Sequence, residues 1–298
     1  MIEKPTIIVT SLGRTGTQYF AKLFDALLDD VTAVHEPDIM NVVEFKGVAR
    51  YAKLWEKINE VGAFNILVKK PLGLWGLVLQ SDKRFLGAVS EQSAIDQILK
   101  QRQQFIQSRP GQIYMESSLA FYGLLDLLPT TFSNYRAAYI VRNGRSWVQS
   151  WMNWGQEHGG IYGKSGISKL MGHNWPTAEQ IPTDAYFDRW PHMSRFERLC
   201  WAWAHFNQHA IDSLEGSEHG RLFKFEDIFS QREKFEELIQ FLVEISPEPV
   251  AQVNLDQLRQ QRKHQSQGQF PAWEKWPEAH KAQFETHCAL LMQRLNYE

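Results

Sequence analysis

An anion-binding turn is indicated near the start of the chain. Residues 7–20 read IIVTSLGRTGTQYF, a β-branched apolar run, a turn rich in glycine and hydroxyl groups, and a segment with helical spacing. Backbone N–H groups of such a turn converge on one point, and the dipole of the following helix adds positive potential there. Arg14 adds a full charge, so the segment predicts a strand, a phosphate-gripping loop and a helix N-terminus. The loop's contacts would come from Gly13, Arg14, Thr15, Gly16, Thr17 and Gln18.

This turn differs from the nucleotide-binding P-loop. That motif requires G-x-x-x-x-G-K-[ST], whereas Gly13 and Gly16 are too close together and no lysine follows the second glycine. Residues 7–20 also contain no Asp or Glu to hold Mg²⁺. The turn therefore disfavours an ATP phosphotransferase and predicts anion binding without a metal ion.

A second strand-turn-helix pattern lies at residues 138–150, AYIVRNGRSWVQS, in which Arg142 ends the apolar run and Ser150 lies on the expected helix. Together with the first loop, this ordered pair resembles the sulfotransferases that use 3′-phosphoadenosine 5′-phosphosulfate (PAPS). In that family a loop with Lys or Arg before [ST]-G-[ST] grips the 5′-phosphosulfate, and a later R-x7-S element binds the 3′-phosphate. The resemblance implies a P-loop-like phosphosulfate loop at residues 14–17, and 3′-phosphate binding by Arg142 and Ser150.

The resemblance runs the length of the chain. Residues 223–227, FKFED, look like the family's strand ending in a YED-type turn, and residues 270–276 with the final helix look like its usual C-terminus. Arg262, Lys263 and His264 lie where the family commonly contributes basic groups to the 3′-phosphate, a region in which well-studied cytosolic members carry an R-K-G triplet. The resemblance implies PAPS as co-substrate, 3′-phosphoadenosine 5′-phosphate (PAP) as product, and no metal ion.

Sulfuryl transfer makes two chemical demands. Charge on the transferring oxygens must be neutralised, and the acceptor must lose its proton. Arg14 meets the first demand because a guanidinium stays charged at any working pH, so we expect electrostatic stabilisation from it rather than proton donation. Glu36, in the segment AVHEPD, resembles the glutamate of the E-P pair in Golgi carbohydrate sulfotransferases, which implies that it is the base. His35 is one alternative, because the ordinary histidine pKa of about 6.5 suits a base, and the other is a structural role for Glu36 with the base elsewhere.

Two other segments lie where relatives contact sulfate or phosphate. Lys69 and Lys70 lie at the end of an expected strand, and because adjacent side chains on a strand point opposite ways, at most one would face the sulfate. Residues 116–118, Glu-Ser-Ser, lack the Lys-[ST]-Pro of many relatives, so no phosphate contact is expected there.

The elements that position these residues alternate along the chain. Apolar or β-branched runs predict strands at residues 6–10, 65–69, 112–115, 137–141 and 221–225. Segments with helical periodicity follow most of them, which predicts one α/β domain over residues 1–298, with a central parallel sheet flanked by helices. Ligands of such sheets bind beyond the carboxyl ends of the strands, where both loops fall. Residues 194–214 predict a long amphipathic helix that packs in the core.

Residues 152–192 are rich in glycine and aromatic residues. They read either as a lid or acceptor wall, or as a surface loop packed by its own aromatics. Trp154 and Trp175, with Glu157 and Asp184, suit a flat or cationic acceptor. We expect transfer to a hydroxyl or nitrogen of a small molecule, such as a guanidinium alkaloid of the saxitoxin type, whose tailoring enzymes belong to the family. A sugar hydroxyl is the main alternative, and a lipid or a phenol is also compatible.

Composition narrows the remaining classes. The chain has 298 residues and a formal net charge of −2, which argues against a nucleic-acid binder with its basic stripe. It has no run of about 18 apolar residues for a membrane helix. Cys200 and Cys288 lie in helical patterns, which predicts buried thiols in a reducing compartment. A soluble cytoplasmic enzyme is expected, with an ATP phosphotransferase or an inactive nucleotide-binding relative as alternatives, and the oligomeric state is not indicated.

Overall fold

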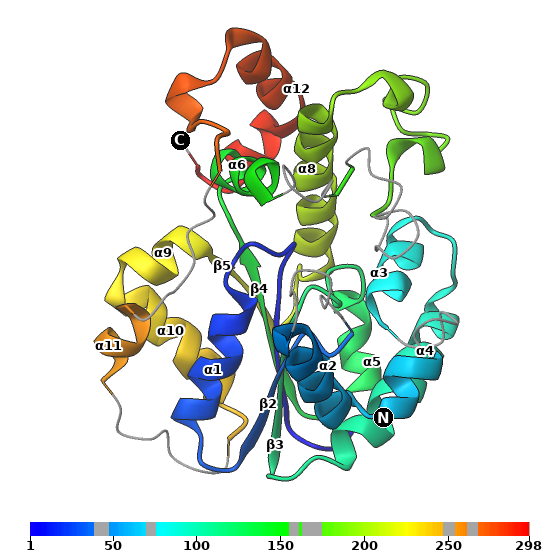
Figure 1. Cartoon of the computed structure of the whole chain (residues 1–298), viewed down its shortest axis with the longest axis vertical. Helices are drawn as coiled ribbons and strands as arrows, with labels where there is room; N and C mark the ends of the chain where they lie inside the picture. Colours follow the sequence, from blue (N-terminus) through cyan, green and yellow to red (C-terminus); the bar gives the residue numbers. More distant parts are fainter. Residues whose placement is uncertain are drawn as a thin grey trace.

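A parallel sheet forms the centre of the molecule. The computed structural model describes residues 1–38, 48–69, 76–154, 161–162, 175–246, 254–260 and 268–297. Its five-stranded sheet has the order β2-β3-β1-β4-β5, and every neighbouring pair is parallel (Figure 1). The strands are β1 (Thr6–Thr10), β2 (Val31–His35), β3 (Ile113–Ser118), β4 (Tyr135–Val141) and β5 (Gly220–Lys224). The predicted α/β fold with a central parallel sheet is confirmed.

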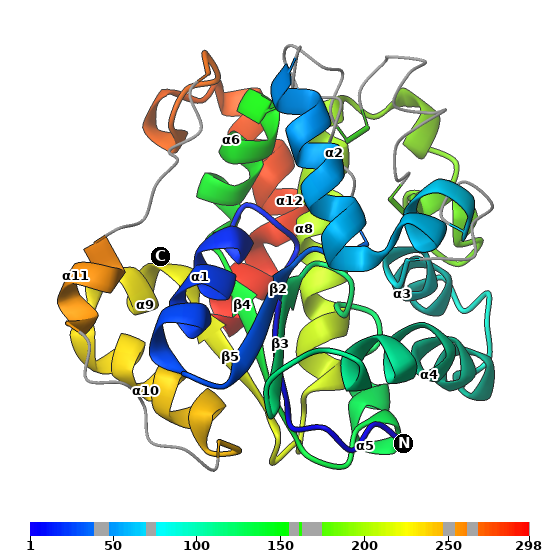
Figure 2. The same cartoon turned by 60° about the horizontal axis from the view of Figure 1, so that its bottom comes forward.

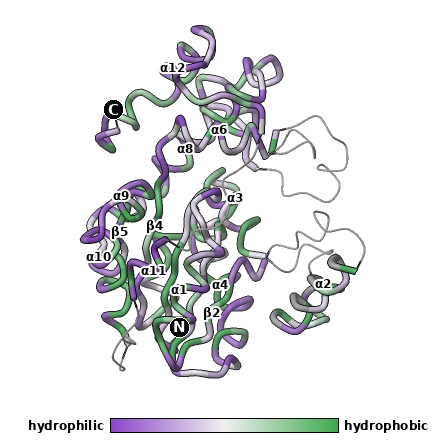
Figure 3. Tube along the Cα trace, turned by 60° about the vertical axis from the view of Figure 1, so that its left-hand side comes forward, coloured by the Kyte–Doolittle hydropathy of each residue, from purple (hydrophilic) through white to green (hydrophobic). Residues whose placement is uncertain are grey.

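Helices cover both faces of this sheet. One side carries α1 (Thr17–Leu27), α9 (Phe225–Ser230), α10 (Arg232–Val243) and α11 (Leu255–Gln260), and the other carries α3 (Val78–Phe85), α4 (Glu91–Gln107), α5 (Leu128–Thr131) and α8 (Arg195–Ser213). Beyond the carboxyl edge, α6 (Gly144–Trp154) and α12 (Glu278–Arg294) pack against α8 (Figure 2). Helix α2 (Val48–Val61) lies at the periphery with the π-helical segment η2 (Asn65–Lys69) (Figure 3). Short 3₁₀ turns span Leu125–Leu127, Ala178–Gln180, Trp190–His192 and Trp273–Lys275.

The central strand β1 is buried on both faces. Ile7 and Val9 pack with Phe24 of α1 in one apolar cluster, whereas Ile8 belongs to the cluster on the opposite face. This alternation follows from the two-residue period of a strand. The helix layers on both sides explain why every residue of β1 is buried, as is usual in parallel sheets.

The strand register brings two turns to one edge. Thr10, the last residue of β1, is paired with Ser118 of β3 and with Tyr139 of β4. The connection after β1 leads through α1 to β2, the strand at one edge of the sheet. The connection after β4 leads to β5, the strand at the opposite edge. Such a switch point, between neighbouring strands whose connections diverge, is where α/β sheets bind ligands.

The long helix predicted at residues 194–214 is confirmed as α8. The Ser194 hydroxyl caps it by accepting a hydrogen bond from the Glu197 amide at 3.1 Å. Cys200 and Cys288 are buried free thiols, as expected, and the Cys288 thiol donates to the Cys200 carbonyl at 3.4 Å. No helix in the described part of the chain is both long and apolar enough to cross a membrane.

The prediction of a strand at residues 65–69 is wrong. These residues form η2, so Lys69 ends a helical segment; Leu67 within it and the preceding Phe64 are exposed. A short apolar run does not by itself distinguish a strand from a helical segment. The sheet edge is formed instead by β2, whose Val34 is buried against the core. The other four expected strands are present, and β3 extends further than predicted, to Ser118.

Gly123 provides a test of the packing behind β3. A Cβ at this position would lie 3.0–3.1 Å from the backbone C and Cα atoms of Ser81 in α3, and backbone cannot move as a side-chain tip can. Gly123→Ala should therefore lower the free energy of unfolding by about 3 kcal/mol in urea denaturation. Gly87→Ala is the control, because its Cβ meets nothing within 4 Å and only its φ of +65° opposes alanine. We expect about 1 kcal/mol for the control, and equal effects would contradict the packing argument.

Candidate functional site

The loop after β1 has an unusual backbone. Gly13, Arg14 and Gly16 have φ values of 72°, 60° and 82°. This left-handed region is readily open to glycine but is uncommon for a residue such as arginine. Gly16 is also the N-cap of α1, so the loop turns directly into the helix N-terminus, as predicted.

Hydrogen bonds brace the loop from inside and from α6. The Ser11 hydroxyl accepts from the Gly13 amide at 3.1 Å and shares a hydrogen bond with the Thr15 hydroxyl at 2.6 Å. From outside, the Trp147 indole donates to the Gly13 carbonyl at 3.2 Å. Gln18 is exposed on the first turn of α1. The loop is therefore held in one shape by groups other than its own helix.

The two predicted phosphate-binding elements meet at the switch point. Arg14 Nε donates to the Ser150 hydroxyl at 3.1 Å, and Arg142 Nη1 donates to the Arg14 carbonyl at 2.7 Å. Arg142 Nε also donates to the Ser146 hydroxyl at 2.9 Å on the first turn of α6. The Arg14 guanidinium lies 5.9 Å from the ring centroid of Trp151. Two guanidinium groups, two hydroxyls and a helix N-terminus thus gather at one place, a donor set suited to phosphate or sulfate.

Both base candidates lie beside the helix that the loop begins. The Thr17 hydroxyl is 3.0 Å from His35 Nε2 and 3.2 Å from Glu36 Oε1, and Nε2 lies 3.7 Å from Glu36 Oε2. The side chains of His35 and Glu36 are 29% and 16% exposed, so both are partly sheltered yet open to solvent. Because Thr17 has one hydrogen to donate, both contacts are satisfied when His35 donates to Thr17 and Thr17 donates to Glu36. Such a chain would connect the two candidate bases through a loop residue.

Glu226 supports the site, and sequence reasoning assigned it no role. Its carboxylate accepts from the Asn143 amide at 3.1 Å and from the Tyr297 hydroxyl at 2.9 Å, and it lies 3.4 Å from the Ser146 hydroxyl. Burial and the nearby carboxylate raise the pKa of Tyr297 well above its usual value, so the phenol remains a neutral donor. The FKFED pattern placed Glu226 just after a strand end, but its partners become visible only in three dimensions.

Several predicted residues lie outside the described part of the chain. These are Lys70, Glu157, Arg262, Lys263 and His264. The chain is described again from Gly268, close to α6: the Asn153 side chain accepts from the Phe270 amide at 2.7 Å, and a Cβ on Gly268 would collide with Asn153. Residues 268–270 are thus attached to the helix that carries Ser150.

The described aromatics of residues 152–192 pack mainly inward. Trp175 is 4% exposed and stacks on Trp147 at 5.9 Å, with an edge contact to Trp151 at 5.4 Å. Asp184 accepts from the Trp201 indole at 3.0 Å. Trp175 and Asp184 are therefore occupied in the core, where they do not form an open acceptor wall. Trp154, at the end of α6, is only partly buried.

Comparison with known proteins gives little independent information. No protein-family model matches the chain, and no curated protein matches it in sequence. Among solved structures, a sulfotransferase domain from the curacin biosynthetic pathway is similar, with a TM-score of 0.42 and 13% identity over 100% of this chain and 99% of that chain. Both values are low, so the function has to be inferred from the residues of the site.

Glu226→Ala tests the bracing of the turn after β4. The change removes the acceptor of the Asn143 amide and the Tyr297 hydroxyl, and because Glu226 is half-buried, water replaces it only in part. We expect the free energy of unfolding to fall by about 1–2 kcal/mol in urea denaturation. Asp227→Asn, at the next residue, is the control and should change it by less than about 0.5 kcal/mol. An unchanged free energy of unfolding in the Glu226 variant would mean that Glu226 does not stabilise the turn.

Proposed function

We propose that the protein is a sulfotransferase that moves a sulfuryl group from PAPS to a hydroxyl or nitrogen of a small-molecule acceptor. The observation that carries this proposal is the meeting of two motifs that are distant in sequence: Arg14 is hydrogen-bonded to Ser150, and Arg142 to the Arg14 carbonyl. Because each guanidinium can pair bidentately with a phosphate or sulfate, two adjacent guanidinium groups can hold two anionic groups of one ligand.

The proposal divides the anionic groups of the donor between the two elements. The loop at residues 13–18 would hold the 5′-phosphosulfate with its amides, its hydroxyls and Arg14, at the N-terminus of α1. Arg142 and Ser150 would hold the 3′-phosphate, with Arg262 and Lys263 as further contacts. Both elements use fixed positive charge, which suits PAPS and PAP without requiring a metal ion.

The proposed reaction needs one base and one cationic group. The acceptor oxygen or nitrogen would form a bond to sulfur while the bond from sulfur to the 5′-phosphate oxygen breaks, and the acceptor proton would go to the Glu36 carboxylate. Arg14 would stabilise the charge on the departing oxygen. The contact of Thr17 with both His35 and Glu36 supports a base at this position, and it leaves His35 as the alternative base or as a partner of Glu36.

The proposed acceptor is a small molecule whose class is expected from residues 152–192. A guanidinium alkaloid or a sugar hydroxyl fits the expectation from residues 152–192. Because Trp175 and Asp184 are packed in the core, an aromatic contact to the acceptor would have to come from Trp154 or from residues outside the described part of the chain.

Calorimetric titration with PAP in EDTA tests the donor site. Adenosine 5′-phosphosulfate is the comparison ligand because it lacks the 3′-phosphate. Arg142→Ala should weaken PAP binding by about 10- to 100-fold, the loss expected for charge-assisted hydrogen bonds of about 1.5–3 kcal/mol. Arg145→Ala is the matched control, because Arg145 lies on the same turn but packs over Trp273 at 4.4 Å.

Three outcomes of this titration would count against the proposal. Absence of PAP binding to the unmodified protein would withdraw the donor assignment, and equal affinity for the two nucleotides would remove the 3′-phosphate site. A requirement for Mg²⁺ would favour the phosphotransferase alternative.

Glu36→Gln tests the base. Glutamine retains an oxygen that can accept from Thr17 but cannot take the acceptor proton at neutral pH. With radiolabelled PAPS and the best acceptor from a panel of alkaloids, sugars and phenols, we expect kcat to fall at least about 100-fold while the Kd of PAP stays within about twofold. If turnover persists in this variant and is lost in His35→Gln, the base is His35.

A further inference from the structure

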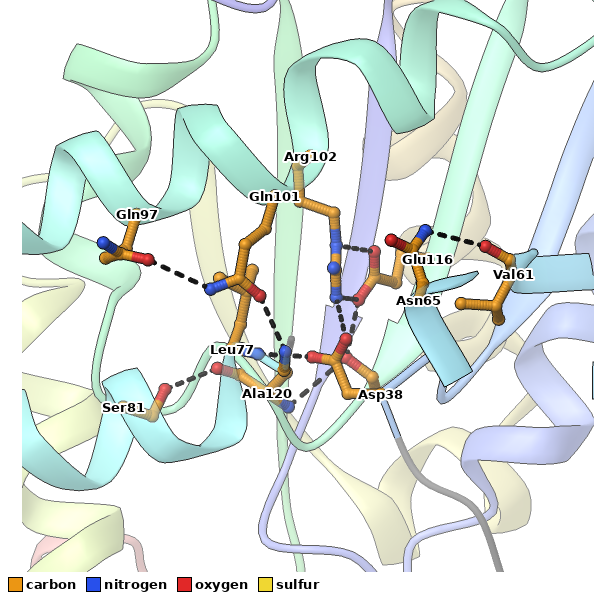
Figure 4. Close-up of polar contacts among 12 residues, drawn as sticks. Asp38, Val61, Asn65, Leu77, Ser81, Gln97, Gln101, Arg102, Glu116 and Ala120 are labelled. Carbon is orange, nitrogen blue, oxygen red and sulfur yellow. Dashed lines mark hydrogen bonds and ion pairs between the residues drawn. The ribbon is translucent and has the colours of Figure 1, made fainter. Parts of the chain in front are cut away.

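A buried arginine lies behind the turn that carries Glu36. Arg102 of α4 is fully buried, and its Nε and Nη2 atoms donate to the two carboxylate oxygens of Glu116 in β3 at 2.9 and 3.0 Å. Its Nη2 atom also lies 2.8 Å from Oδ1 of Asp38. Figure 4 shows the guanidinium between the two carboxylates. Asp38 follows β2 and comes two residues after Glu36.

The groups around Arg102 stabilise its positive charge and the negative charges of the two carboxylates. Burial alone would lower the pKa of Arg102, but Asp38 and Glu116 raise it above the usual value, so the guanidinium stays charged. One guanidinium faces two carboxylates, so neutral donors stabilise the remaining negative charge. The Tyr114 and Ser118 hydroxyls donate to Glu116 at 2.9 and 3.1 Å, and the Leu77 amide donates to Asp38 at 2.7 Å. A buried ion group of this kind adds little stability over apolar residues, and its best-attested use is to specify one arrangement.

What these contacts specify is the position of the Glu36 turn. The Glu36 amide donates to the Ser117 carbonyl of β3 at 3.0 Å, next to Glu116, and two residues later Asp38 is held by Arg102. Glu36 itself has a φ of 45°, a conformation that persists only where its surroundings impose it. The turn is therefore fixed to β3 on one side of Glu36 and to α4 on the other.

Gln101 of α4 and Asp38 together hold a second segment. Gln101 accepts from the Gly76 amide at 2.7 Å, while Asp38 accepts from the amide of Leu77. The contacts of Asp38, Gln101, Arg102 and Glu116 are called the anchor. The anchor joins residues 38 and 76–77, although α2 and η2 lie between them in the sequence. A change at the anchor reaches the base turn directly, whereas it reaches the loop that contains Arg14 through the hydroxyl of Thr17.

We propose that Arg102 is a positioning residue for Glu36, acting through Asp38. The proposal rests on the proposed function, because it assigns Arg102 to the alignment of the base and not to donor binding. The backbone of the loop at residues 13–18 is held by Trp147 of α6 and by Arg142, and the Thr17 hydroxyl of this loop contacts the Glu36 turn.

Asp38→Asn is the primary test. Asparagine keeps an oxygen for the Leu77 amide and removes the charge that faces Arg102. We expect kcat to fall at least 10-fold with labelled PAPS, with the Kd of PAP changed by less than twofold. Asp126→Asn is the matched control: it weakens the more exposed pair of Arg84 and Asp126, 3.0 Å apart, and should leave kcat unchanged. An unchanged kcat in a folded Asp38→Asn protein, or an equal loss of kcat and PAP affinity, would overturn the proposal.

A neutral triple variant separates positioning from stability. Asp38→Asn, Arg102→Met and Glu116→Gln together remove all three buried charges, so the protein should keep most of its resistance to urea. Positioning by the charged group predicts that kcat nevertheless stays at least 10-fold below that of the unmodified protein. Recovery of kcat together with stability would assign Arg102 a purely structural role.

Amide hydrogen exchange tests, without a turnover measurement, whether the anchor fixes the turn that carries Glu36. In Asp38→Asn, the amides of His35, Glu36 and Asp38 should exchange at least 10-fold faster, while those of α1 exchange at the original rate; Pro37 between them has no amide hydrogen. PAP titration of the unmodified protein decides the proposed function separately. If PAP does not bind, the proposed function fails, whereas unchanged exchange at residues 35–38 would overturn the role of Arg102 even in a protein that binds PAP.

Discussion

The parallel register of β1 between β3 and β4 is the constraint on which the candidate site depends. Thr10 is paired with Ser118 on one side and with Tyr139 on the other. Parallel strands direct their carboxyl ends to the same edge, so the turns that follow β1 and β4 leave the sheet side by side. The contacts of Arg14 and Arg142 follow from that placement. The apolar layers on both faces hold the register, because a slip of one residue would exchange the two faces of β1.

Local backbone strain is concentrated where chemistry is proposed. Among the described residues, the non-glycine positions with positive φ are Arg14, Glu36, Tyr162 and Asn296. The first two carry the proposed cationic and basic roles. Each is held from a neighbouring element: the Arg14 carbonyl accepts from Arg142, and the Glu36 amide donates to Ser117. Such strain costs on the order of 1–3 kcal/mol and persists because these contacts offset it.

Features whose cause lies within one helix or strand can be predicted from the sequence, whereas features that depend on contacts between elements cannot. Strands 6–10 and 137–141 and the helix at 194–214 follow from apolar patterns within the element itself, and they were predicted well. Residues 65–69 carry the same kind of pattern, yet they are helical, because a short apolar run does not by itself distinguish a strand from a helical segment. Trp175 and Asp184 were expected near an acceptor, whereas packing against α6 and α8 uses them in the core.

By itself, the sequence determined the fold class, the two strand-turn-helix elements and the short list of candidate bases, because these depend on residue types at fixed spacing along one segment. The tertiary structure decided which of those residues meet: Arg14 with Ser150, and Thr17 with both His35 and Glu36. It also decided that Arg102 and Glu226 support the site. Their partners come from three or more separate segments, and no pattern within one segment records a contact that exists only after the strands have paired.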